Sequence, residues 1–238
     1  MKHVLVLLAL FCAAPARAGD ICPGSQNQDL HLPVTKAAIS NKNAVVIVAL
    51  GSSSSRGAQA SDPGHSYPAV LQAALSRLLP GAEIAVVNRG VDGQDATREL
   101  ARLGTDVIPL RPQLVIWQVG ANGALRGTDP TVFGSLVTAG VNRLTEAGAD
   151  VILMDNQRAP AILRAPARVA IESALANVAR TTKTNLFSRG ALMDEWRTEG
   201  FGYGLFVSPD GLHHNDLGYR CLSEALARDI AAAVSPPP

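Results

Sequence analysis

The amino-acid sequence predicts a three-layer α/β/α domain with a five-stranded parallel sheet at its centre. Apolar runs rich in Val and Ile recur along the chain, and they are continuous rather than alternating. Continuous runs are typical of parallel strands buried on both faces. The segments between the runs carry apolar residues at helical spacing. Because strands alternate with helices, helices are expected to cover both faces of the sheet.

The predicted elements follow one another in a regular order. The strands are residues 44–50 (AVVIVAL), 83–88 (EIAVVN), 113–119 (QLVIWQV), 150–155 (DVILMD) and 185–188 (NLFS). The helices between and after them are residues 67–79, 131–147, 162–183 and 217–234. Pro80 with Gly81 is expected to end the first of these helices, and Gly148 the second. Trp117 lies within a predicted core strand, where packing is its expected role.

Residues 1–18 are predicted to be a secretory signal peptide rather than part of the fold. Lys2 and His3 precede an apolar run, and residues 16–18 (ARA) are typical of a cleavage site. The run is shorter than the roughly 20 residues of a membrane-spanning helix. Residues 19–238 are therefore expected to form a single periplasmic or secreted domain with no integral membrane association.

The charge balance excludes partners that need a strong positive field. The 238-residue chain carries 21 Lys and Arg against 20 Asp and Glu. Without Lys2 and Arg17 the mature chain has 19 basic residues against 20 acidic ones, a net charge of −1. Nucleic acid is therefore not an expected partner.

Cys22 and Cys221 are the two cysteines that remain after the predicted cleavage. In an oxidising compartment they are compatible with a disulfide that fastens the N-terminal segment to the last helix. Two separate buried thiols are the alternative. Neither the number of cysteines nor their spacing suits a metal site.

Small and polar residues follow the predicted strands, at the edge where parallel-sheet proteins bind ligands. Four serines, residues 52–55, follow the first strand, and residues 120–123 (GANG) follow the third. Residues 155–158 (DNQR) follow the fourth, where a pocket wall and a structural turn are both consistent with the sequence. Near the C-terminus, Asp210 and His213 are spaced so that a carboxylate can orient an imidazole. A serine hydroxyl, a base and its carboxylate are the groups that acyl transfer requires.

Other known motifs do not fit the serine run or the histidines near the C-terminus. The G-x-S-x-G elbow is absent because Ser55 stands where its second glycine belongs. The run also lacks the Gly-Lys-Ser/Thr of a phosphate-binding loop. His213, His214 and Asp216 could be read as metal ligands, but adjacent histidines in an extended loop diverge. No metal and no cofactor are expected.

Four motifs together resemble the SGNH or GDSL-like hydrolases. In chain order they are residues 51–53 (GSS), 88–93 (NRGVDG), 120–123 (GANG) and 210–213 (DGLH). Residues 51–54 (GSSS), 115–120 (VIWQVG) and 210–222 (DGLHHNDLGYRCL) together are similar to secreted proteobacterial members. The resemblance implies a flavodoxin-like fold and a serine esterase that needs no cofactor.

The resemblance also implies a role for each site residue. Ser53 is the nucleophile, His213 the general base and Asp210 the group that orients His213. The N–H groups of Ser53 and Gly90 and the side chain of Asn122 form the oxyanion hole. Ser52, Ser54 and Ser55 are then expected to be turn or capping residues.

Two positions depart from the family pattern. Gly123 stands where the family usually has Asp, so the turn that holds Asn122 is expected to be looser. His214 stands where Pro or Met is common, and it is expected to alter the rim of the pocket. Nothing in these departures removes a member of the triad.

The resemblance leaves the substrate open. Short acyl esters, such as acetyl esters of a carbohydrate or cell-wall polymer, fit an exported enzyme with a site built from small residues. A lysophospholipase or thioesterase acting on longer acyl chains is the alternative enzyme. A non-catalytic binding protein of the same fold is the alternative from another class, and Gly123 is its only support.

Overall fold

The computed structural model describes residues 22–235, and the predicted signal peptide lies outside this range. Five strands form one parallel sheet in the order β2-β1-β3-β4-β5. They are β1 (Val45–Gly51), β2 (Ile84–Gly90), β3 (Leu114–Gln118), β4 (Asp150–Met154) and β5 (Asn185–Phe187). The predicted fold class and all five predicted strands are confirmed, with shifts of one or two residues at the ends. This strand order places the switch point between β1 and β3, where ligands bind in such sheets.

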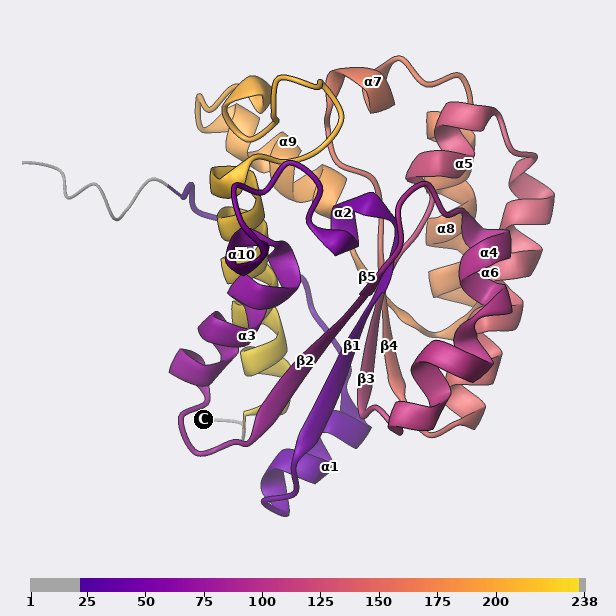
Figure 1. The fold of residues 1–238 in the computed structure, drawn as a ribbon. Coiled ribbons are helices and arrows are strands. Elements are labelled where there is room, and N and C mark those ends of the chain that lie inside the picture. The colour runs from indigo at the N-terminus through magenta and orange to yellow at the C-terminus, as the bar shows by residue number, and fades with distance from the viewer. Residues whose placement is uncertain (1–21, 236–238) are drawn as a thin grey trace, which may run out of the picture.

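Helices cover both faces of the sheet, as Figure 1 shows. One face is packed by α1 (Pro33–Ser40), α3 (Tyr67–Leu78), α9 (Arg189–Thr198) and α10 (Asp216–Val234). The other is packed by α4 (Ala96–Ala101), α6 (Pro130–Glu146) and α8 (Arg168–Thr182). The short helices α2 (Ser53–Arg56), α5 (Ala121–Arg126) and α7 (Pro160–Leu163) lie near the carboxyl ends of the strands. Two hydrophobic cores, one on each side of the sheet, result from this layering.

Two predictions about these elements were wrong. The helix predicted over residues 162–183 is two helices, because α7 ends at Leu163 and α8 begins at Arg168. Pro166 lies in the gap, and a proline inside a helix removes a backbone donor and clashes with the preceding turn. β2 is not buried on both faces, because it is an edge strand that pairs only with β1.

Trp117 has the packing role that its place in β3 predicts. Its ring is fully buried against Gly140 of α6, where an added Cβ would lie 2.4 Å from the indole. Its Nε1 donates to Glu99 Oε2 at 2.8 Å, and both residues are buried. Burial raises the pKa of Glu99 to about 8. The indole N–H therefore donates a hydrogen bond to a carboxyl group that is buried away from water.

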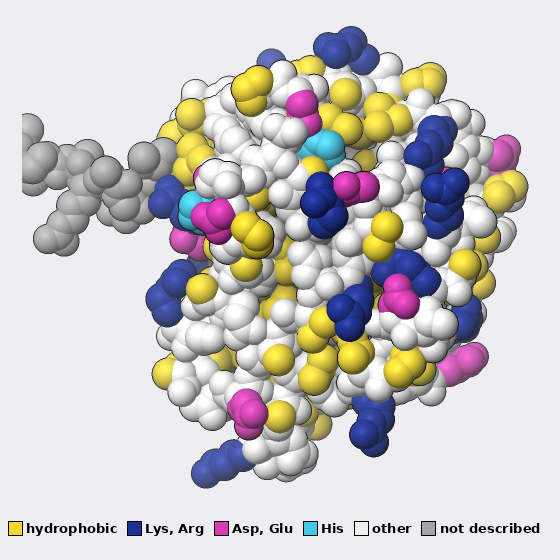
Figure 2. All heavy atoms as spheres, in the orientation of Figure 1, with side chains coloured by type: hydrophobic (Ala, Val, Ile, Leu, Met, Phe, Trp, Pro, Cys, Tyr) yellow, Lys and Arg dark blue, Asp and Glu magenta, His cyan; other side chains and the backbone are white. Residues whose placement is uncertain are grey.

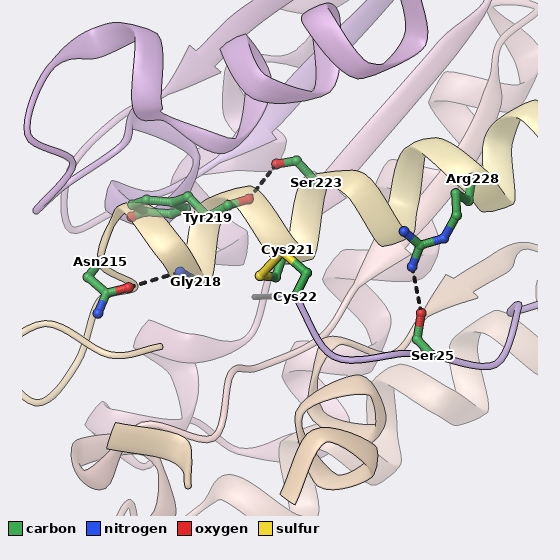
Figure 3. Close-up of a disulfide and its surroundings, with 8 residues drawn as sticks. All are labelled: Cys22, Ser25, Asn215, Gly218, Tyr219, Cys221, Ser223 and Arg228. Carbon is green, nitrogen blue, oxygen red and sulfur yellow. Dashed lines mark hydrogen bonds between the residues drawn. A yellow bond between two sulfur atoms is a disulfide. The ribbon is translucent and has the colours of Figure 1, made fainter. Parts of the chain in front are cut away.

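Cys22 and Cys221 form a disulfide between the N-terminal segment and α10 (Figure 3). Around it, Asn215 accepts from Gly218 N–H at the start of the helix, and Arg228 donates to Ser25 further along. The two half-cystines are 199 residues apart in the sequence. The disulfide therefore ties the first described residues to the last helix, and the alternative of two separate thiols is excluded.

Removal of this disulfide is expected to lower the free energy of unfolding by about 2–4 kcal/mol, because a long closed loop restricts the unfolded chain. The double variant Cys22→Ser, Cys221→Ala should unfold at lower urea concentration than the oxidised protein. Adding a reductant should lower the midpoint of the wild-type protein but not that of the variant. Equal midpoints for oxidised and reduced wild-type protein would contradict the prediction.

The surface in the orientation of Figure 2 carries charges of both signs in close alternation, with hydrophobic side chains scattered among them. This face has no extended field of one sign. Within residues 22–235, no helix combines the length and the apolar character needed to cross a bilayer.

Candidate active site

Ser53 lies at the carboxyl end of β1 and begins the short helix α2. The turn into it requires Gly51, because an added Cβ there would lie 2.3 Å from Ser55 Oγ and 2.8 Å from the Gln118 carbonyl oxygen. Gln118 Oε1 accepts from both the N–H and the hydroxyl of Ser52, at 3.3 and 3.2 Å. Ser52 is therefore a turn residue that anchors the chain to β3, which is one of its two expected roles, and its side chain makes no cap hydrogen bond to the described residues.

Ser53, His213 and Asp210 lie in one hydrogen-bonded chain. Ser53 Oγ is 2.8 Å from His213 Nε2, and His213 Nδ1 is 2.6 Å from Asp210 Oδ2. Because a carboxylate faces Nδ1, the proton of the neutral ring belongs there, and Nε2 is left to accept from the Ser53 hydroxyl. The structure thus brings together the three residues that the motifs single out, from positions 160 residues apart.

Asp210 is held by several donors besides the imidazole. Its Oδ1 accepts from the Ser208 hydroxyl at 2.6 Å and from the N–H groups of Leu212 and His213 at 2.9 and 3.0 Å. Partial burial alone would raise the pKa of Asp210. The hydrogen bonds from His213, Ser208 and the backbone outweigh that effect and hold the pKa well below its usual range. The carboxylate therefore stays ionised and fixed in orientation.

Asn122 lies in the first turn of α5, beside Ser53 and His213 in the lining of one small cavity. Its Nδ2 donates to the Gln94 carbonyl oxygen at 2.7 Å, which leaves the second amide hydrogen for another acceptor. This bond holds the Asn122 side chain, although Gly123 stands where the family usually has Asp. An added Cβ at Gly123 would meet neighbours only at 3.6 Å or more.

Gly90 does not fit the role of an oxyanion donor. Its N–H already donates to Asn88 Oδ1 at 2.9 Å. The reason for glycine here is close packing, because an added Cβ would lie 2.1 Å from the backbone nitrogen of Arg56 in α2. Gly93, three residues further on, has a φ of +68°. Its N–H makes no hydrogen bond to protein within residues 22–235.

Substitution of Gly90 by alanine is expected to lower the free energy of unfolding by about 1–3 kcal/mol, because the methyl group overpacks the contact with α2. The displacement of α2 should also lower kcat/KM for ester hydrolysis. Gly81→Ala is the matched control, since an added Cβ there has no neighbour within 4 Å. Urea unfolding and kinetics of both variants test this, and equal stability of the two variants would refute it.

Two further groups support the site and were not predicted from sequence. Gln118 is the last residue of β3, and its polar side chain at the end of an apolar run is the signal that could have identified it. Arg102 has no such signal. Its Nη2 donates to the carbonyl oxygens of Gly51 and Arg89, and this joins the ends of β1 and β2.

Residues 155–158 divide between the two roles that the sequence left open. Asp155 accepts from the Ser188 hydroxyl and Gly190 N–H, and Arg158 forms ion pairs with Glu172 and Asp194. These two residues are structural. Gln157, by contrast, lines the cavity beside Ser53.

The prediction that His214 alters the rim of the pocket was wrong. The ring is fully buried, and its Nδ1 donates to the Phe206 carbonyl oxygen at 3.0 Å. Burial lowers the pKa of His214 to about 3, so the ring stays neutral. The two adjacent histidines diverge as expected, and only His213 faces Ser53.

Comparison with known proteins agrees with this fold. A model of the non-GDSL lipase-like family matches residues 12–236. An arylesterase from Vibrio mimicus is 34% identical over 89 residues, which cover 37% of this chain and 44% of the arylesterase. The matched region is thus less than half of that relative's length.

Solved structures of esterases share the architecture. A two-domain esterase active on acetylated mannans has a TM-score of 0.72 at 19% identity, over 88% of this chain and 55% of that one. Axe2, an acetylxylan esterase from Geobacillus stearothermophilus, has a TM-score of 0.67 at 20% identity, over 79% of this chain and 96% of that one. At such identities the likeness concerns the fold. Because the family model spans nearly the whole sequence and the fold and motifs agree with it, this chain belongs to the non-GDSL lipase-like family of SGNH/GDSL-like hydrolases.

Proposed function

We propose that this protein is a carboxylic ester hydrolase that works through an acyl-enzyme on Ser53. The observation that carries the proposal is the chain of two short hydrogen bonds from Ser53 through His213 to Asp210. His213 Nε2 takes the hydroxyl proton as Ser53 Oγ attacks the ester carbonyl carbon. Asp210 stabilises the imidazolium that results. His213 then gives the proton to the leaving alcohol oxygen. In the second half of the reaction His213 takes a proton from water, the water oxygen attacks the acyl carbon, and His213 returns the proton to Ser53 Oγ as the acid leaves.

We propose that the developing oxyanion is held by the Ser53 N–H and the free amide hydrogen of Asn122. Gly93 takes the place predicted for Gly90 as a third donor. Support comes from its unengaged N–H and from the bond between Asn122 and the neighbouring Gln94. All of these donors belong to the chain, so the proposed steps require no metal and no cofactor.

Short acyl esters, especially acetyl esters of a carbohydrate or cell-wall polymer, are the proposed substrates. The cavity that Ser53 lines is small. Its accessible volume is about 10 Å³, which is roughly enough for one water molecule. A cavity of this size beside Ser53 supports a small acyl group such as acetyl. Two esterases of the same fold support this choice, one active on acetylated mannans and the other an acetylxylan esterase.

Export to the periplasm or the medium is part of the same proposal. The predicted signal peptide over residues 1–18 and the disulfide between Cys22 and Cys221 both support it, because disulfides persist in oxidising compartments.

A panel of p-nitrophenyl esters from two to twelve carbons, together with acetylated xylan, mannan and peptidoglycan, tests the substrate proposal. We expect the highest kcat/KM for the two-carbon ester and release of acetate from at least one polymer. A preference for eight carbons or more would instead favour the lysophospholipase or thioesterase alternative. Absence of hydrolysis across the panel would favour a non-catalytic binding protein.

A further inference from the structure

Gln157 carries a buried acceptor that no group within residues 22–235 satisfies. The residue follows β4 and its side chain is fully buried. Its Nε2 donates to the Leu212 carbonyl oxygen at 2.7 Å. A carbonyl oxygen can only accept, so this bond fixes the orientation of the amide. The Oε1 atom is consequently left without a partner among the described residues.

Unlike the other buried polar atoms that lack a partner, this acceptor belongs to a residue that lines the cavity at Ser53. Gln157 lines the same cavity as Ser53, Asn122 and His213. Of the other lining residues, Ala121, Leu125 and Leu212 have no side-chain donor. The hydroxyl groups of Ser52 and Ser54 make no hydrogen bond to Gln157 Oε1. Buried carbonyl groups are almost always hydrogen-bonded, and one left unpaired costs free energy that a donor on a ligand recovers.

We infer that Gln157 Oε1 accepts a hydrogen bond from a hydroxyl group of the ester substrate and so selects esters that carry one near the reacting carbonyl. The inference rests on the proposed ester hydrolysis at Ser53 and makes Gln157 a specificity-determining residue. A site built to bind a hydroxyl discriminates against an analogue without it, because the buried acceptor then stays unpaired. Esters of sugars and of hydroxy acids both have such a hydroxyl.

Two pairs of small esters distinguish the source of the hydroxyl. In the first, 2-hydroxyethyl acetate is compared with 2-fluoroethyl acetate, so that the donor is on the alcohol. In the second, ethyl glycolate is compared with ethyl fluoroacetate, so that the donor is on the acyl group. Fluorine is close to a hydroxyl in size but donates no hydrogen. Each pair gives a ratio of kcat/KM, hydroxyl over fluorine.

The ratio is measured for the wild-type protein and for Gln157→Met and Gln157→Leu, which remove the acceptor. We expect one pair to show a ratio about ten-fold higher in the wild-type protein than in either variant. The two esters of a pair differ in intrinsic reactivity, but that difference is the same for every protein and cancels when the wild-type and variant ratios are compared. A displacement of the loop that holds His213 affects both esters of a pair alike and cancels within each ratio. If only one of the two variants folds, its ratio alone is compared with that of the wild-type protein. Leu125→Val is the control, because it changes the cavity wall without touching the acceptor and should keep the wild-type ratio.

The results separate this inference from the proposed function. Hydrolysis of the esters with equal ratios in wild-type and variant proteins would overturn the role of Gln157 and leave Ser53 chemistry intact. Absence of hydrolysis in the wild-type protein would overturn both. A raised ratio in the first pair identifies a hydroxyl of the alcohol as the recognised group, and one in the second pair identifies a hydroxyl of the acid.

Discussion

Ser53→Ala is expected to lower kcat/KM for p-nitrophenyl acetate by about 10⁴-fold or more and to leave the fold unchanged. Without the hydroxyl no acyl-enzyme forms, so the only catalysis that remains comes from binding and from the oxyanion donors. The side chain is partly exposed, and within the described part of the chain its hydroxyl bonds to His213 alone. The change should therefore cost little stability, and urea unfolding should give a midpoint close to that of the wild-type protein.

Ser55→Ala is the matched control from the same serine run. Its hydroxyl makes long contacts of 3.4 Å to the Leu50 carbonyl oxygen and 3.5 Å to Gln118, and it also lies beside the Tyr67 hydroxyl, away from His213. We expect the control to keep kcat/KM within about ten-fold of the wild-type value. Incubation with an acetyl donor followed by intact-protein mass spectrometry should show acetylation of the wild-type protein and none of Ser53→Ala. Comparable turnover by Ser53→Ala and the wild-type protein would remove Ser53 from the mechanism.

The layers of the fold could be predicted because apolar runs and helical spacing are local properties of the sequence. The division of residues 162–183 was missed, although Pro166 was the local signal for it. The edge position of β2 could not be predicted in the same way. It depends on strand order, and nothing within residues 83–88 specifies which strands pair with them.

The meeting of Ser53 with His213 follows from motif resemblance and from the rule that carboxyl ends of parallel strands share one edge. Gly90 shows where such reasoning fails. The motif contains two glycines, at 90 and 93, and only the structure reveals that the first is required by the approach of α2. Gln157 contributes through a hydrogen bond to Leu212, and Arg102 through hydrogen bonds to Gly51 and Arg89. The partners of such bonds have no fixed spacing in the sequence.

The geometry around Asp210 makes its replacement by asparagine more damaging than the loss of one charge. Three donors converge on Oδ1, from Ser208, Leu212 and His213. An asparagine must leave its carbonyl oxygen there, because an NH₂ group in that position would face three donors. Its NH₂ group is consequently directed at His213 Nδ1, which then has to accept. The imidazole proton moves to Nε2, and that nitrogen can no longer take the proton of Ser53.

Asp210→Asn is therefore expected to lower kcat by about 10⁴-fold with little change in KM. ¹⁵N NMR of His213 should report the proton on Nδ1 in the wild-type protein and on Nε2 in the variant, a difference that a merely loosened loop would not produce. Ser208→Ala is the control, because it removes one donor to Oδ1 but keeps the carboxylate, and it should retain activity within about ten-fold. If Asp210→Asn retained wild-type kcat, the ring would not depend on this carboxylate for its tautomer. Ser53 would then have to be activated by His213 alone, through the 2.8 Å contact between Oγ and Nε2.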